Sequence, residues 1–318
     1  MKTINTGNHI HFRKRTVLEF IGLFVLLYVT YLQRDTIQHA FREIIHSKPI
    51  YIFAALAVYW MILPLTAISY RLLSDKRLNI WSTTLAQLSG SGPGRIIPGG
   101  LGRISLAVVH LIKLGFSSSR ALIITVTSNF IGIIVNVIVL ILILFFEPDI
   151  ASLLNINNTL PSALGLLLLV LISIFVMQWL YHAKKTSNSM LKLTKKWSKQ
   201  IKIIRKNPLL FARLVAIALL ILAGHVIMLL LSAYALNIQI DAGDALIALS
   251  VGVLVGGILP TPGGIGGVEA GIASTLIFLG YGPSESTSVA LLFRAITYWQ
   301  PLIPGTIAYF YLRRRKLL

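Results

Sequence analysis

Four charged residues lie in apolar or glycine-rich segments of this 318-residue chain, namely Arg95, Arg103, Glu269 and Arg294. A charge at membrane depth costs several kcal/mol unless it is paired or wetted, so such residues indicate function. Guanidinium groups form paired hydrogen bonds with phosphate oxygens, and a carboxylate neutralises an arginine or binds a cation. The four residues therefore predict a substrate-binding site for a phosphate, in which Glu269 balances charge or contacts a cationic headgroup.

Proline and glycine gather beside these charges in two short segments. The predicted tips consist of Pro98, Gly99, Gly100 and Gly102 in the first segment, and of Pro260, Pro262, Gly263, Gly264 and Gly266 in the second. Backbone N–H groups at helix starts favour anions, which supports a binding role for both tips. Two plainer interpretations stay open: the glycines serve close helix packing, or Glu269 and Arg294 form a buried structural pair.

Common catalytic signatures are absent from the sequence. It contains no HExxH, Walker A or GxSxG pattern, no cysteine, and only ten acidic residues. We expect no enzyme activity, cofactor or metal from this pattern. The formal net charge of +19 does not indicate a nucleic-acid binder, because the basic residues lie between apolar runs.

The composition, 56% hydrophobic and 12% charged, is that of an integral membrane protein. Helices of about 20 apolar residues cross the hydrocarbon of a bilayer. The fold class is therefore predicted as an all-α polytopic membrane protein. Its six predicted spans cover residues 17–33, 50–73, 120–146, 161–182, 209–236 and 287–312.

Basic residues collect in three of the segments between and beyond these spans. Residues 1–16 contain four, 183–208 contain nine and 313–316 contain four, with no acid in any of them. Since basic loops stay in the cytoplasm, both termini and the loop 183–208 are predicted to be cytoplasmic. That loop either meets anionic lipid headgroups or docks a soluble partner.

The two tip segments belong to an internal repeat. Pro98 and the glycines after it align with Pro262 and its glycines at an offset of 164 residues, and an apolar stretch ending in LGF or LGY follows each tip. The first copy lies between basic loops and the second between acidic ones, so the two copies are inverted. Inverted repeats with broken helices near the midplane are typical of transporters.

Each copy enters and leaves by one face, as a re-entrant hairpin or as two full crossings. The predicted arms have 15 to 17 residues, which is short for a crossing and favours re-entry. The arms cover 81–97, 101–115, 243–259 and 266–280. The predicted halves are 1–146, with hairpin 80–115, and 147–318, with hairpin 243–280 and the basic cytoplasmic loop 183–208.

Three strings carry a family resemblance: LPTPGGIGGVEAG at 259–271, PGRIIPGGLGR at 93–103, and YWQPLIPG at 298–305 after Arg294. They resemble the flippase-like membrane family that includes the transmembrane half of lysylphosphatidylglycerol synthases. The resemblance implies a multi-pass protein of a prokaryotic cytoplasmic membrane that handles lipid. The synthase domain of bifunctional members has no counterpart in these 318 residues, so a stand-alone lipid transporter is expected.

The leading hypothesis is translocation of an anionic or aminoacylated lipid, phospholipid or polyprenyl-phosphate-linked, between leaflets. Arg95 and Arg103 would hold the phosphate from one side and Arg294 from the other. One alternative is an intramembrane enzyme that acts on a lipid phosphate with Glu269 as base. The other is a non-transporting partner of a separate lipid synthase or glycosyltransferase.

Overall fold

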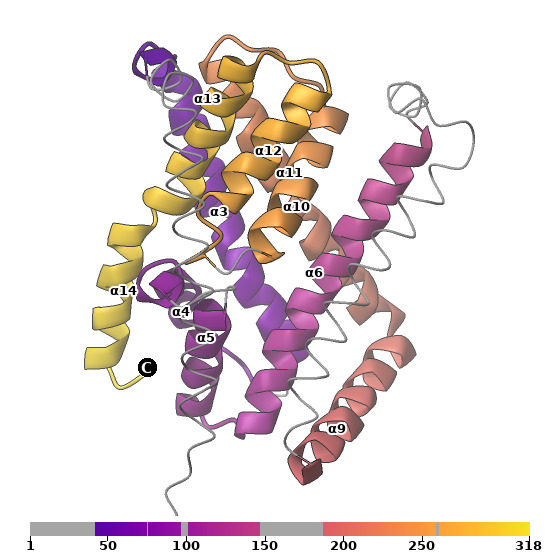
Figure 1. Ribbon diagram of the computed structural model, residues 1–318. Coiled ribbons are helices and arrows are strands. Elements are labelled where there is room, and N and C mark those ends of the chain that lie inside the picture. Colours follow the sequence, from indigo (N-terminus) through magenta and orange to yellow (C-terminus); the bar gives the residue numbers. More distant parts are fainter. Residues whose placement is uncertain (1–41, 75, 97–100, 147–186, 259–260) are drawn as a thin grey trace, which may run out of the picture.

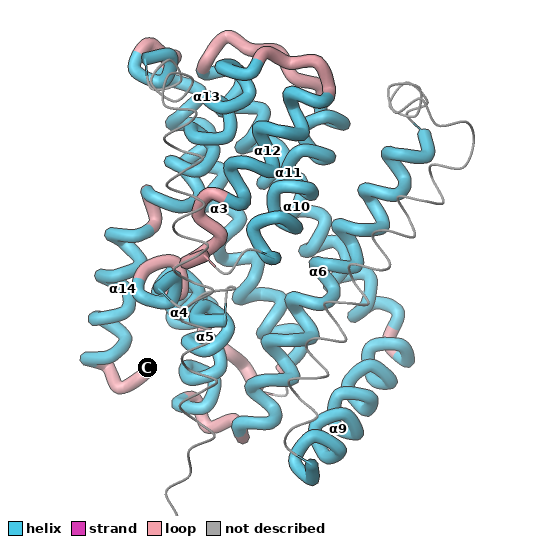
Figure 2. The backbone as a smooth tube through the Cα atoms, viewed as in Figure 1, coloured by secondary structure: helices cyan, strands magenta, loops and turns pink. Residues whose placement is uncertain are grey.

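The computed structural model describes residues 42–74, 76–96, 101–146, 187–258 and 261–318, and within these ranges the regular elements are helices (Figures 1 and 2). The predicted all-α class is confirmed. Several predictions fall outside the described residues. These are the spans 17–33 and 161–182 and the tip residues Pro98, Gly99, Gly100 and Pro260.

Three helices are long and apolar enough to cross a membrane, so the protein is a multi-pass membrane protein. They are α3 (Pro49–Leu73), α6 (Ser118–Phe146) and α10 (Pro208–Ala235), close to the predicted spans 50–73, 120–146 and 209–236. Proline at the first turn suits the start of α3 and α10, because its missing N–H has no helical partner there. The side chain of Asn207 caps α10 by accepting from the Leu210 N–H at 3.0 Å.

Two pairs of shorter helices pack between the long ones. The first pair lies in the lower half of the bundle in Figure 1 and the second in the upper half. With 10 to 17 residues, each helix is shorter than a full crossing requires. The pairs are α4 (Ile80–Ser89) with α5 (Leu101–Lys113), and α11 (Ala242–Ile258) with α12 (Gly267–Phe278).

Glycine allows α11 and α12 to approach closely. A Cβ atom on Gly271 would lie 2.7 Å from the Gly252 Cα, and one on Gly252 would lie 2.6 Å from the Ile272 side chain. The helices therefore pack backbone against backbone at these positions, as small residues permit in membranes. Close packing explains these two glycines, and it leaves the glycines of the tip to be explained separately.

The last predicted span, 287–312, is not one continuous helix. The chain forms α13 (Pro283–Arg294), a π-helical turn η2 (Ala295–Trp299), and α14 (Leu302–Arg314). The Gln300 N–H donates to the Ala295 carbonyl at 2.8 Å, and Pro301 has no N–H with which to continue the ladder. In Figure 1, α13 lies in the upper half and α14 in the lower half, so the break lies at the level where the two helix pairs meet.

The basic connection predicted over 183–208 contains a helix, α9 (Ser187–Lys206). Its Trp197 anchors it to α6. The indole N–H donates to Thr127 Oγ1 at 3.2 Å, and the ring meets Phe130 edge-on at a centroid distance of 5.4 Å. The predicted loop is thus an amphipathic helix that packs against the bundle and presents Lys196, Lys199 and Lys202 on its exposed surface.

Candidate functional site

The second tip has a backbone that favours glycine. Gly263, Gly264 and Gly266 have φ values of 60°, 72° and 79°, which lie in the left-handed region. A Cβ atom on Gly263 would also lie 2.5 Å from the Tyr298 ring. These glycines therefore turn the chain between α11 and α12 and let an aromatic side chain lie directly against the tip.

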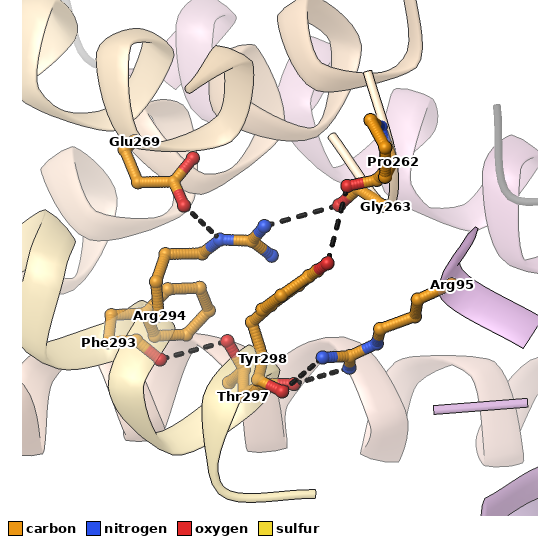
Figure 3. Close-up of polar contacts among 8 residues, drawn as sticks. All are labelled: Arg95, Pro262, Gly263, Glu269, Phe293, Arg294, Thr297 and Tyr298. Atoms are coloured by element: carbon orange, nitrogen blue, oxygen red, sulfur yellow. Dashed lines mark hydrogen bonds and ion pairs between the residues drawn. The ribbon is translucent and has the colours of Figure 1, made fainter. Parts of the chain in front are cut away.

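Glu269 and Arg294 form an ion pair beside this tip. The Arg294 Nε atom donates to Glu269 Oε1 at 2.8 Å, and Arg294 Nη2 donates to the Gly263 carbonyl at 3.2 Å (Figure 3). The Arg294 side chain is 9% exposed and the Glu269 side chain 16%, so the pair is largely shielded from solvent. This confirms the predicted pairing of Glu269 with an arginine. The second carboxylate oxygen, Oε2, is buried and has no hydrogen-bond partner in the structure.

Arg95 reaches the break in the last helix from the other half of the chain. It lies in the turn η1 (Pro93–Ile96) and donates to the carbonyls of Tyr298 and of Thr297, the latter at 2.8 Å. In an α-helix the Thr297 carbonyl would accept from residue 301, but Pro301 has no N–H. Pro301 therefore cannot donate to this carbonyl, and the Arg95 guanidinium group does, as buried backbone in a membrane requires.

Tyr298 joins these two arrangements. Its ring lies between two guanidinium groups, with the Arg95 Cζ atom 4.1 Å and the Arg294 Cζ atom 4.4 Å from its centroid (Figure 3). Its hydroxyl donates to the Pro262 carbonyl at 3.3 Å. Cation–π attraction on both faces lets two positive groups approach the same ring. Tyr298 was not predicted as a site residue; its place four residues after Arg294 and three before Pro301 is the sequence feature that points to it.

Arg103 lies apart from the cluster that Arg95, Glu269, Arg294 and Tyr298 form. It is in α5, its side chain is exposed, and it makes no hydrogen bond with the described residues. Its stem packs along Gly90, where an added Cβ would lie 2.7 Å from the Arg103 Cγ. Gly102 is the first-tip residue that the structure describes, and its backbone packs against the Gly94 carbonyl so tightly that a Cβ would collide. Three of the four predicted charges are therefore brought together.

The sequence matches the family described as "Lysylphosphatidylglycerol synthase TM region" over residues 19–305. The chain belongs to this family. No curated protein matches it by sequence. The match spans nearly the whole chain, including both tips and all four predicted charges, and it identifies a membrane protein related to lipid modification or transport.

In this family member, the cluster at the tips carries a surplus of positive charge. Arg95 and Arg294 contribute +2 and Glu269 contributes −1, which leaves +1. Backbone carbonyls satisfy the hydrogen bonds of Arg95 but carry no net charge. Among the described residues, no group of three or more His, Asp or Glu side chains is placed to hold a metal ion. The arrangement is thus suited to attract an anion.

Proposed function

We propose that the protein moves an anionic or aminoacylated lipid, phospholipid or polyprenyl-phosphate-linked, between the leaflets of the cytoplasmic membrane. The observation that carries this proposal is the uncancelled positive charge where the two helix pairs face each other. A cation at membrane depth is costly, so an anionic ligand is favoured there. Membership of a family related to lipid modification or transport supports a lipid as that anion.

Two parts of the cluster fit two parts of such a headgroup. Arg95 lies in the cluster, whereas Arg103, which follows the first tip in the sequence, is exposed outside it; the guanidinium groups of both suit a phosphate. Glu269 Oε2 is buried and unpaired, and a buried carboxylate oxygen is stabilised by a donor. An ammonium group on an aminoacylated lipid is a donor of the right charge. Arg294, from the second half of the chain, pairs with the other carboxylate oxygen, Glu269 Oε1, and forms the opposite side of the proposed site.

We also propose that the two helix pairs are re-entrant hairpins of an inverted repeat, with halves 1–146 and 147–318. The short helices, the opposed tips and the broken last helix support this architecture (Figure 1). Lys76, Arg120 and Arg313 lie at the end of the bundle where α3 ends and α6 begins, and Asp244 and Glu285 lie at the opposite end. The basic end is then cytoplasmic, along with both termini. Rocking of the halves about the tips would give alternating access.

The test is leaflet-resolved transport by purified protein in proteoliposomes. The panel contains fluorescent phosphatidylglycerol, an aminoacylated phosphatidylglycerol and a polyprenyl phosphate. We expect one class to move, and Glu269→Gln to abolish the movement because it removes the carboxylate that holds Arg294 in place and that would bind a cationic headgroup. Glu285→Gln is the matched control, since Glu285 is an exposed acid at the start of α13.

Three results would contradict the proposal. Full transport by both Glu269→Gln and Arg95→Gln would place the site elsewhere. If no lipid moved while the protein was still folded and inserted, the proposal of lipid translocation would be refuted. Turnover of a headgroup in place of movement would favour the intramembrane enzyme.

A further inference from the structure

A cavity of about 310 Å³ lies between α3, α6, α10 and α11, separate from the cluster around Tyr298. Its walls are mainly aliphatic, from residues such as Leu140, Leu222 and Leu254. Ile133 and Val253 line it and are 42% and 56% exposed, so the cavity opens toward the surroundings of the bundle. Its volume is within the range of about 300–1,000 Å³ that is typical of ligand pockets.

One wall of this cavity carries a buried hydroxyl without a partner. Ser250 is 1% exposed, lines the cavity, and its Oγ makes no hydrogen bond in the structure. Other serines in this region are satisfied: Ser69 and Ser128, which also line the cavity, bond each other at 2.8 Å. A serine in a helix often bonds the carbonyl four residues back, as Ser232 does with Met228 at 2.8 Å. Ser250 has not taken that option and remains a donor available to a ligand.

Helix α11 links this cavity to the second tip. Leu254 lines the cavity, and Gly256, two residues later, lies against the tip, because a Cβ on Gly264 would lie 3.1 Å from the Gly256 carbonyl oxygen. Tyr298 bonds the same tip through its hydroxyl, and the Arg95 Cζ atom lies 4.1 Å from its ring centroid. A lipid with its phosphate near Arg95 would therefore have a chain within reach of the cavity.

We propose that the cavity binds one ester-linked acyl chain of the lipid, with the Ser250 hydroxyl donating to the ester carbonyl. This inference rests on the proposed function, because the phosphate of the same lipid lies at Arg95 and Arg103. The aliphatic walls match a hydrocarbon chain, and an ester carbonyl is the acceptor that Ser250 lacks. A hydrocarbon chain without an ester would fill the volume but would leave Ser250 unpaired.

The first test is photo-crosslinking of the purified full-length protein in nanodiscs. The probe is a phosphatidylglycerol with a diazirine near the carboxyl end of one acyl chain, and mass spectrometry locates the labelled residues. We expect labels on α6 over residues 128–140 and on α10 over 214–225, which line the cavity.

A glycine substitution tests whether the label reports occupancy of the cavity. Gly132 lines it, and a Cβ on Gly132 would meet nothing within 4 Å. Gly132→Leu should therefore place an apolar side chain in the cavity from a position with room for its Cβ, and remove the label. Gly257→Leu is the matched control, since Gly257 is also a helical glycine with nothing within 4 Å and does not line the cavity.

The role of Ser250 is tested with two lipids and two serines. Ser250→Ala should lower labelling by the ester-linked probe about fivefold, the effect of one lost hydrogen bond. It should leave labelling by an ether-linked probe of equal length unchanged, since the ether has no carbonyl. Ser286→Ala is the control, because Ser286 is equally buried at 1% exposure and unpartnered but lies outside the cavity.

The outcomes separate this inference from the proposed function. Transport of phosphatidylglycerol without any label in the cavity would overturn the acyl-chain site and leave translocation standing. A cavity label without transport of any lipid would leave the site standing and overturn translocation. Equal labelling of Ser250→Ala and wild type by the ester probe would refute the hydrogen bond to the carbonyl.

Discussion

Replacement of Arg95 by lysine separates the charge of this residue from its hydrogen-bond geometry. The guanidinium group donates to the Thr297 and Tyr298 carbonyls at once and lies over the Tyr298 ring. A lysine ammonium keeps the positive charge but lacks the planar fork that reaches two acceptors. We therefore expect Arg95→Lys to retain attraction for an anion and to lose part of the connection between the first helix pair and the broken last helix.

The size of the loss follows from the contacts. A hydrogen bond to a charged group contributes about 1.5–3 kcal/mol, and lysine loses one of the two. A change of 1 kcal/mol shifts the Tm by about 2–4 °C for chains of roughly 150–250 residues. Taking that scale for this chain, Arg95→Lys should lower the Tm by about 3–12 °C. Arg95→Ala should lower it further, because both carbonyls then lose their donor.

The measurement is thermal unfolding of the purified protein, followed by circular dichroism in one detergent. Arg103→Lys is the matched control, since Arg103 lies beyond the same tip, is exposed, and makes no hydrogen bond with described residues. Its Tm should stay near that of wild type. Equal shifts for the two lysine variants, or no shift for Arg95→Lys, would refute the assignment of Arg95 as the donor to the freed carbonyls.

Three further predictions concern the supports of the site and the two ends of the bundle. Gly263→Ala should lower the Tm more than Gly280→Ala does. Both glycines have positive φ values (60° and 98°), but a Cβ meets the Tyr298 ring only at Gly263. Equal shifts of the Tm would show that the ring moves aside freely. Trp197→Phe should speed protease cleavage near α9, because it removes the hydrogen bond of about 1 kcal/mol to Thr127; an unchanged rate would show that ring packing alone holds the helix. Burial and the hydrogen bond to Asp244 raise the pKa of Tyr281 from 10.0 to about 12, so its contribution to stability is present below pH 10 and is lost as the pH rises through 12; Tyr281→Phe should remove that part of the pH dependence of the Tm.

The sequence was sufficient for the membrane class and for most helix positions. Long apolar runs can be satisfied in lipid only as helices, so α3, α6 and α10 follow from hydropathy. The break after Arg294 was harder to foresee, because residues 287–312 are apolar enough to be taken for one span. Pro301 was visible, but a proline inside a membrane helix can also produce a simple kink. The donor to the carbonyls at the break, Arg95, comes from a distant segment.

The charges of the site were predictable, and their partners only in part. Any buried arginine needs a carboxylate or a carbonyl, so Glu269 with Arg294 was a natural pair. Tyr298 was missed because an aromatic residue in an apolar helix has no distinctive pattern. The separation of Arg103 from the cluster depends on the rotation of α5 about its axis, which Gly90 and Gly102 set through packing contacts. Such contacts are tertiary and cannot be read from local sequence.

The site depends on both halves of the chain because each supplies what the other lacks. In the second half, the charges of Glu269 and Arg294 cancel, and Pro301 leaves a carbonyl without a donor. The first half brings Arg95, which satisfies that carbonyl and pairs with no carboxylate among the described residues. A carbonyl dipole binds the guanidinium group without neutralising it, so the surplus positive charge of this cluster arises from the contact between the two halves. Under the proposed function an anion would bind at this junction, where a relative movement of the two halves would change its exposure.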